Sequence, residues 1–158
     1  MRLDLIRHAA ATPRVVGLSD ASRALTPRGR ARFRRVVAGL RRLGVGYDVA
    51  YHSPKLRAVE TADLFAPLVD GETVVTPNLA RPPAAALLAE IRGERVALVG
   101  HEPMLSALAA WLVFGDRRRG AKLPAKKGGV LMLEGELRPG AMRLVASLPP
   151  KALRKIAR

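Results

Sequence analysis

The chain has 158 residues, enough for one domain with a hydrophobic core and too few for two of ordinary size, so we expect a single domain over residues 1–158. Its composition, 49% hydrophobic with only 4% aromatic residues, excludes a disordered chain, and the lack of cysteine excludes a disulfide scaffold, thiol chemistry and a cysteine-bound zinc. The net charge of +15 favours anionic partners, without deciding between nucleic acid, polyphosphate, an acidic protein and a phosphorylated small molecule.

Short β-like runs alternate with helical patterns along the chain. A strand is expected at residues 3–6, and Thr26-Pro27 then begins a helix to about residue 43, with Thr26 as N-cap and Pro27 as first helical residue. Ser53-Pro54 is expected to begin a second helix, to about residue 68. The remaining predictions are strands at 48–51, 73–75, 95–99, 130–133 and 142–146, helices at about 82–92 and 103–114, and an irregular basic segment at 116–128. Residues 151–158 are expected to form a short basic helix or a frayed end.

This alternation predicts the α/β class: a three-layer α/β/α domain with a mostly parallel sheet of about six strands, one of them antiparallel. The antiparallel strand is expected because the turn signal Pro139-Gly140 separates the last two β runs. No apolar run reaches the roughly 20 residues of a membrane span. The first apolar stretch is too short and too charged for a signal peptide, and we expect a cytoplasmic protein without membrane contact.

Three predicted strands are each followed directly by residues suited to hold a phosphate. Arg7-His8 follows the first strand, Ser53 to Arg57 follows the second, and His101 follows the strand at 95–99. Ligands bind at the carboxyl ends of the strands in open α/β sheets. Two guanidinium groups can grip phosphoryl oxygens in bidentate fashion, and a neutral imidazole can attack phosphorus if its other ring nitrogen is fixed by a hydrogen bond. A second imidazole, when protonated, would bind a further oxygen.

These residues resemble the histidine phosphatase superfamily, also called phosphoglycerate mutase-like. Arg7-His8 resembles its nucleophile motif, Ser53-Pro54-x-Leu56-Arg57-Ala58-x-x-Thr61 its second-arginine motif, and His101 its second histidine. The stretch Arg23-Ala24-Leu25-Thr26-Pro27-Arg28-Gly29 is similar to one in the small bacterial phosphohistidine phosphatases of the SixA type. The resemblance implies that His8 is the phosphorylated nucleophile and that Arg7, Arg57 and His101 hold the phosphoryl group. Arg23, Ser53 and Glu102 are further candidates for substrate binding.

Two features depart from the wider superfamily. Ala9 follows the nucleophile where most members have Gly, a change that the small phosphatases share. Residues 76–89 contain no acidic side chain, although many relatives carry a proton donor there or in a lid. An alkoxide leaving group needs that proton, whereas an imidazole, with a conjugate-acid pKa of about 6.5, does not, so a phosphoramidate substrate tolerates the gap. Glu90 and Glu102 are candidate substitutes, with a solvated side chain and a helix cap as their alternative roles.

Several other residues have two readings each. His52 is expected to pack at a strand end, with a role in the site as the alternative. Glu60 could orient Arg57 or form a helix-surface pair. Arg23 could touch the phosphate or form a surface ion pair. The lysines of the basic segment could recruit an acidic substrate or form a solvated loop; they are Lys122, Lys126 and Lys127.

The leading hypothesis is a metal-independent phosphatase, needing no cofactor, that transfers a phosphoryl group from a protein phosphohistidine or another phosphoramidate to His8 and then to water. A general small-molecule phosphomonoesterase is an alternative, and so is a module that binds phosphate, polyphosphate or an acidic partner through its basic surface. The lack of an acid and of a lid disfavours a mutase. Nucleic acid is disfavoured because the aromatic residues show no stacking pattern.

Overall fold

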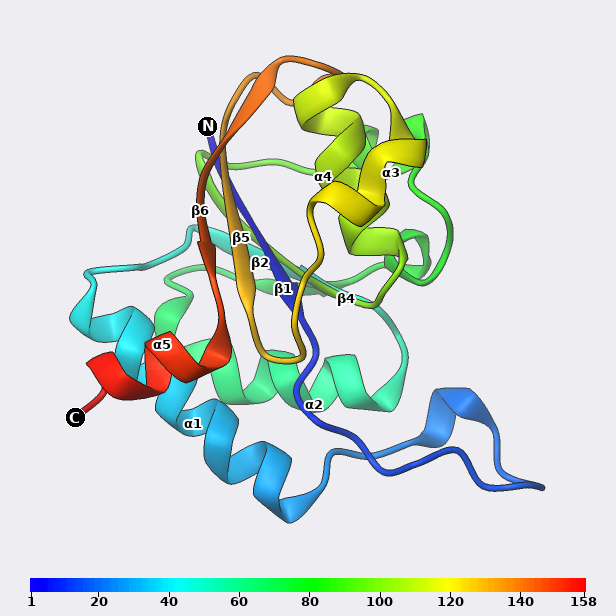
Figure 1. The fold of residues 1–158 in the computed structure, drawn as a ribbon, viewed down its shortest axis with the longest axis vertical. Helices are drawn as coiled ribbons and strands as arrows, with labels where there is room; N and C mark the ends of the chain where they lie inside the picture. Colours follow the sequence, from blue (N-terminus) through cyan, green and yellow to red (C-terminus); the bar gives the residue numbers. More distant parts are fainter.

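Six strands form one mixed sheet in the computed structural model, which describes all residues from 1 to 158 (Figure 1). The strand order is β3-β2-β4-β1-β5-β6, with β1 to β4 mutually parallel and β5 antiparallel to both of its neighbours. The predicted α/β class and the single antiparallel strand are therefore confirmed. The strands are β1 Arg2–Arg7, β2 Val49–His52, β3 Thr73–Val75, β4 Arg95–Gly100, β5 Val130–Gly135 and β6 Met142–Leu148.

Helices cover both faces of this sheet (Figure 1). One face carries α1 (Pro27–Arg42), α2 (Leu56–Phe65) and α5 (Pro150–Ile156), and the other carries α3 (Ala85–Glu90) and α4 (Met104–Phe114). The Thr26 hydroxyl accepts a hydrogen bond from the Gly29 N–H at 2.9 Å, which confirms the predicted cap of α1. No helix combines the length and the apolar character that a membrane crossing requires.

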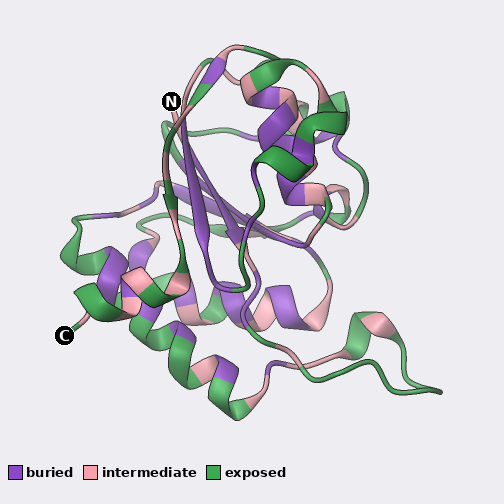
Figure 2. Cartoon of the chain, in the orientation of Figure 1, coloured by how far each residue is buried: buried purple, intermediate pink, exposed green.

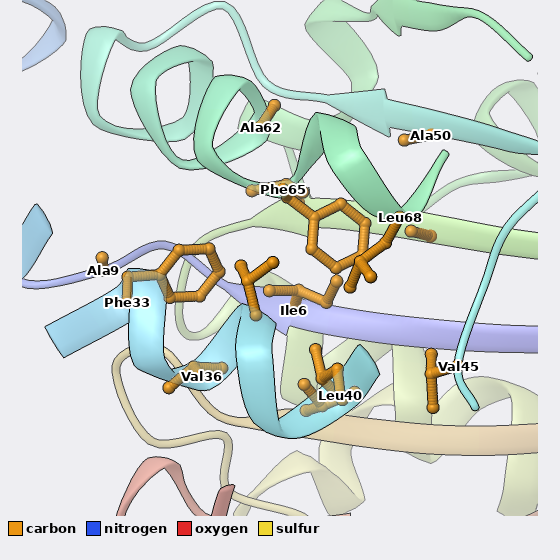
Figure 3. Close-up of a cluster of buried hydrophobic side chains, with 14 of the residues drawn as sticks. Ile6, Ala9, Phe33, Val36, Leu40, Val45, Ala50, Ala62, Phe65 and Leu68 are labelled. Atoms are coloured by element: carbon orange, nitrogen blue, oxygen red, sulfur yellow. The ribbon is translucent and has the colours of Figure 1, made fainter. Parts of the chain in front are cut away.

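Side chains that alternate along the central strands build a separate core on each face. Ile6 of β1 packs with Phe33 and Leu40 of α1 on one side (Figure 3), whereas its neighbour Leu5 packs toward α4 on the other. Figure 2 shows the central strands as buried and the outer helix surfaces as exposed. Asp4 is fully buried, and burial raises the pKa of its carboxyl group to about 6, although the group accepts a hydrogen bond from the Tyr47 hydroxyl at 2.6 Å.

Two predicted helices begin later in the structure than the prolines suggested. The second begins at Leu56, because the Ser53 hydroxyl accepts a hydrogen bond from the Lys55 N–H and holds Pro54 in a turn before the helix. It ends at Phe65, and residues 66–68 form a 3₁₀ turn. The third helix spans Ala85–Glu90 instead of 82–92, and Ala84, its N-cap residue, offers no side-chain cap. The basic segment, predicted as irregular, contains a 3₁₀ helix at Arg117–Lys122.

The strands β2, β4 and β1 lie side by side, and their carboxyl ends reach the same edge of the sheet. In register, Arg7 lies opposite Gly100 and His52 lies opposite Val99. The pairing extends by one more hydrogen bond on each side, from the His8 N–H to the Gly100 carbonyl at 3.0 Å and from the Ser53 N–H to the Val99 carbonyl at 3.1 Å. Three segments that are far apart in the sequence therefore present their first loop residues together.

Candidate active site

His8 is buried at this edge with its ring in a defined tautomer. Its Nδ1 lies 2.7 Å from the carbonyl oxygen of Ala9, which can only accept, so Nδ1 carries the proton and Nε2 has the free lone pair. Burial, with a smaller contribution from the positive charges of Arg57 and Arg7, lowers the pKa of His8 to about 4. The imidazole is therefore neutral at pH 7 and nucleophilic at Nε2.

Arg57, the second residue of α2, brings its guanidinium group to that nitrogen. Its side chain is 5% exposed, and its Nε–H donates to His8 Nε2 at 3.3 Å. The other two nitrogens face Asp20: one donates to the Asp20 carbonyl at 2.7 Å and the other to the carboxylate at 3.0 Å. All three nitrogens of Arg57 are thus engaged, and Asp20 fixes the orientation in which Nε faces His8.

Asp20 is a site residue that the sequence did not predict. It lies in the long connection between β1 and α1, which reaches away from the sheet as an extended, mostly exposed loop (Figures 1 and 2). Its carboxylate also accepts hydrogen bonds from Arg23 and Lys55, each at 2.9 Å. These bonds, with that from Arg57, hold the pKa of Asp20 far below its usual range. The sequence signal was its position three residues before Arg23, beside the capping residue Ser19.

Arg7 is half-buried and is the last residue of β1, directly before His8. It donates to the Ala125 carbonyl at 2.9 Å, while its Nε is buried without a hydrogen-bond partner in the chain. Glu102 accepts a hydrogen bond from the Ala125 N–H at 3.0 Å, and the Ser106 hydroxyl lies 2.7 Å from the same carboxylate oxygen. The carboxylate of Glu102 therefore anchors the segment that holds Arg7.

His101 directly follows β4 and faces His8, with the two ring centroids 5.1 Å apart. Its Nε2 lies 2.7 Å from the Ser53 hydroxyl, and its Nδ1 is buried without a partner. Burial lowers the pKa of His101 to about 3, with repulsion from a protonated His8 and from Arg57 as further causes. In the free protein this second imidazole is therefore neutral, and Ser53 fixes its position.

The motif residue Thr61 connects α2 to the turn that follows His8. Its hydroxyl accepts a hydrogen bond from the Ala9 N–H at 3.1 Å and donates to the Arg57 carbonyl at 2.6 Å. Gly29 lies against the same turn, since a Cβ on Gly29 would overlap the carbonyl oxygen of Ala10. The second-arginine motif and the start of α1 thus both support the backbone that fixes the His8 tautomer.

The remaining candidates lie at the edge of this arrangement or outside it. Glu60 does not contact Arg57: it accepts a hydrogen bond from the Leu25 N–H at 2.6 Å and pairs with Arg30. Glu90 accepts hydrogen bonds from the Thr76 hydroxyl at 2.6 Å and from the Asn78 amide at 2.5 Å.

Arg23 donates to the Asp20 carboxylate and to the Thr12 carbonyl, and its contact with the phosphate stays a prediction. His52 lies at the end of β2 with Nδ1 2.9 Å from the Ser53 carbonyl. Among the three lysines, the charge of Lys127 acts on His8, whereas Lys122 and Lys126 line a separate hollow beside β5 and β6.

A buried neutral imidazole, flanked by arginines at the carboxyl edge of a mostly parallel sheet, defines an α/β protein built for phosphoryl transfer. The sequence matches the model of the histidine phosphatase superfamily (branch 1) over residues 3–81, and the chain belongs to this superfamily of phosphatases. The matched segment contains His8, Asp20 and Arg57 but not His101. An uncharacterized protein of Picosynechococcus sp. is 34% identical over 154 residues, covering 92% of this chain and 90% of that protein.

Three solved structures share the fold. A protein histidine phosphatase SixA complexed with tungstate has a TM-score of 0.79 and 22% identity, over 97% of this chain and 99% of that one. The alpha-ribazole phosphatase of Shigella flexneri has a TM-score of 0.72 and 20% identity, over 95% and 97%. The phosphoserine phosphatase of Entamoeba histolytica, in complex with 3-phosphoglyceric acid, has a TM-score of 0.73 and 17% identity, over 96% and 98%. Since these names imply three substrates, the fold alone does not determine the substrate.

Proposed function

We propose that the chain is a metal-independent phosphatase that forms a phosphohistidine on His8 and acts on a protein phosphohistidine or another phosphoramidate. The observation that carries the proposal is the state of His8: a neutral ring whose Nδ1–H is fixed by the Ala9 carbonyl and whose Nε2 faces Arg57. In this proposal residues 1–158 act as one domain, because the site combines segments from both halves of the chain.

The reaction takes two displacements at phosphorus. In the first, the Nε2 lone pair of His8 forms a P–N bond while the P–N bond of the substrate breaks. The leaving ring departs as a neutral imidazole when solvent has protonated its far nitrogen. In the second, water forms a P–O bond, the bond to Nε2 breaks and His8 returns to its neutral state with Nδ1 still protonated. One proton of the water passes to solvent, and inorganic phosphate is released.

Three groups around His8 are suited to hold the phosphoryl oxygens. Arg57 Nε already points at Nε2 and would donate to an oxygen on the new phosphorus atom. Arg7 Nε and His101 Nδ1 are buried without partners in the chain, which is unfavourable unless an added acceptor or donor satisfies them. A phosphoryl group supplies such oxygens, and its negative charge would favour protonation of His101.

The substrate class, a phosphoramidate or an ester, depends on whether the leaving group needs a proton from the protein. No carboxylic acid in the site is placed to donate one. Asp20 is held ionised by Arg57, Lys55 and Arg23 and cannot act as the acid. The carboxylate oxygens of Glu90 accept hydrogen bonds from Thr76 and Asn78. Glu102 accepts the Ala125 N–H, as an anchoring carboxylate does. An imidazole leaving group needs no such acid, which supports a phosphoramidate substrate.

The phosphoenzyme can be trapped directly. The protein is mixed with ³²P-labelled phosphoramidate and quenched in alkali, and label that is stable in base and labile in acid is then mapped by peptide analysis. We expect label on the peptide that contains His8 and none in His8→Ala. His52→Ala removes a histidine at the neighbouring strand end and serves as the matched control, which should be labelled normally. Equal turnover by His8→Ala and the wild type would refute the proposal.

The substrate class needs a separate comparison of kcat/KM. We expect a phosphohistidine peptide and phosphoramidate to be hydrolysed much faster than a phosphoserine peptide of the same sequence, with rates unchanged by a metal chelator. If the phosphoserine peptide is hydrolysed as fast, the chain is instead a general phosphomonoesterase in which some group protonates the leaving alkoxide, and the inference from the missing acid is wrong. If chelation abolishes turnover, the metal-independent mechanism is wrong.

A further inference from the structure

The helices α1 and α5 pack closely and bring two sets of basic side chains together. Gly39 of α1 permits the close contact, because a Cβ there would overlap the carbonyl oxygen of Leu153 in α5. Leu153 is fully buried in the interface, and Figure 1 shows α5 lying beside α1. Arg35 donates to the Arg154 carbonyl at 3.3 Å. The charged side chains of both helices are therefore held at the rim of one interface.

This rim encloses a hollow of about 290 Å³ that is lined by cations alone. No Asp or Glu side chain forms an ion pair with any of them. Arginines at the other end of the sheet differ, since Arg95 and Arg143 each pair with a carboxylate. The lining residues are Arg32, Arg35, Lys151, Arg154, Lys155 and Arg158.

A second hollow, of about 320 Å³, continues from the first toward the site. The two hollows share Arg32 and Arg154. The second also includes Lys127, whose charge acts on His8, and Ala9, whose carbonyl fixes the His8 ring. We call the two adjoining hollows the basic track; it runs from the exposed face of α5 to the turn that follows the nucleophile.

We propose that the basic track binds an acidic segment of the protein substrate, next to the phosphorylated side chain that enters the site. The charge is complementary, because a run of Asp or Glu would neutralise cations that have no carboxylate partner within the chain. The track ends at Ala9 and Ala10, the residues directly after His8, so a segment bound along it would hold its phosphorylated side chain close to the site. Its one aromatic side chain, Phe33, is buried and offers no face for stacking bases, which disfavours a nucleic acid.

The inference rests on the proposed function for its link to catalysis, but binding can be tested without turnover. A fluorescein-labelled peptide of eight Glu residues is titrated with His8→Ala protein and followed by anisotropy at about 50 mM and about 300 mM salt. The test variant carries Lys151→Glu and Lys155→Glu, at two exposed side chains that line the first hollow and form no ion pair in the chain. The matched control carries Arg34→Glu and Arg41→Glu, which make the same charge change on α1 outside the track.

We expect the test variant to bind the Glu peptide at least tenfold more weakly than the His8→Ala parent at low salt, and the control variant less than threefold more weakly. The higher salt concentration should also weaken binding of the peptide to the parent. Equal losses in both variants would show that only the net charge matters and would overturn the proposal. Binding of a single-stranded oligothymidine more tightly than the peptide would assign the track to nucleic acid and overturn it as well. Far-ultraviolet circular dichroism checks that all variants are folded.

Turnover connects the track to the site. The test variant should lose at least tenfold in kcat/KM on a phosphohistidine peptide with an acidic flank and keep its rate on small phosphoramidate. Loss on both substrates alike would contradict docking. If no phosphoenzyme forms on His8, the proposed function fails while the anisotropy result still decides the track. If the phosphoenzyme forms and the Glu peptide does not bind, only the track is wrong.

Discussion

The charge state of His8 can be tested by lowering the pH. An ordinary imidazole with a pKa of about 6.5 is about 90% protonated at pH 5.5, whereas burial and the nearby guanidinium groups lower the pKa of His8 to about 4. About 97% of the His8 rings should therefore remain neutral at pH 5.5. The difference between the two pKa values corresponds to about 3 kcal/mol in favour of the neutral ring. The free protein should keep roughly ten times more competent nucleophile at this pH than an exposed histidine would.

Nitrogen-detected NMR of the histidine rings measures both the charge and the tautomer. The chain has three histidines, so His52→Ala and His101→Ala assign the signals by elimination. We expect His8 to show a protonated Nδ1 and an unprotonated Nε2 from pH 7.5 down to about 5, because the Ala9 carbonyl accepts the Nδ1 proton. A midpoint near 6.5, or a proton on Nε2, would refute both the buried-nucleophile reasoning and the assignment of the attacking nitrogen.

Three further predictions concern groups that support the site and the core. Replacing Asp20 by Ala should free the guanidinium group of Arg57 and lower kcat about tenfold or more, because Arg57 is then no longer oriented toward His8. Inhibition by inorganic phosphate should become tighter, because one negative charge near the site is lost. An unchanged kcat would contradict the positioning role of Asp20. Gly29→Ala should lower the free energy of unfolding by about 2 kcal/mol in a urea titration, because the new Cβ would overlap the carbonyl oxygen of Ala10. Gly46→Ala is the control, because a Cβ there would meet nothing within 3.6 Å and should cost less. For Asp4, whose pKa is raised from 3.8 to about 6, the carboxyl group of the unfolded chain loses its proton first as the pH rises, so stability is lost between pH 4 and 6. Relative to Asp4→Asn, the wild type should lose about 2 kcal/mol of unfolding free energy from pH 4 to 7, and a constant difference would show that the folded carboxyl titrates normally.

The central architecture and most of the site were predictable because their signals are local. Arg7-His8, Ser53 and His101 each lie at the end of a predicted strand, and the carboxyl ends of parallel strands lie at the same edge of a sheet. The cap at Thr26 and the following proline also act within one turn, and the structure reproduces that helix start. These predictions needed no knowledge of which strands are neighbours.

The errors occur where a side chain binds a distant segment. Ser53 was expected to begin a helix, but its hydroxyl binds both the Lys55 N–H and His101, and the helix starts later. Glu60 lies near Arg57 in sequence and yet joins Leu25 on the far loop. Asp20 was missed because its role arises only when the long loop after β1 folds back on α2. Such contacts are properties of the tertiary structure: the spacing of Asp20 and Arg23 indicates an ion pair between neighbours but not the contact with Arg57.

The sheet order has a consequence for the order of events in the cell. The strand β4 lies between β1 and β2 but is made after both, so a ribosome that has released the first 94 residues has produced His8 and the Arg57 helix α2 without the strand that joins β1 to β2. The second histidine is also still to come. A nascent chain, or a product of premature termination before β4, therefore carries Arg7-His8 and Arg57 in its sequence but lacks the strand that brings them together, and we expect it to be inactive.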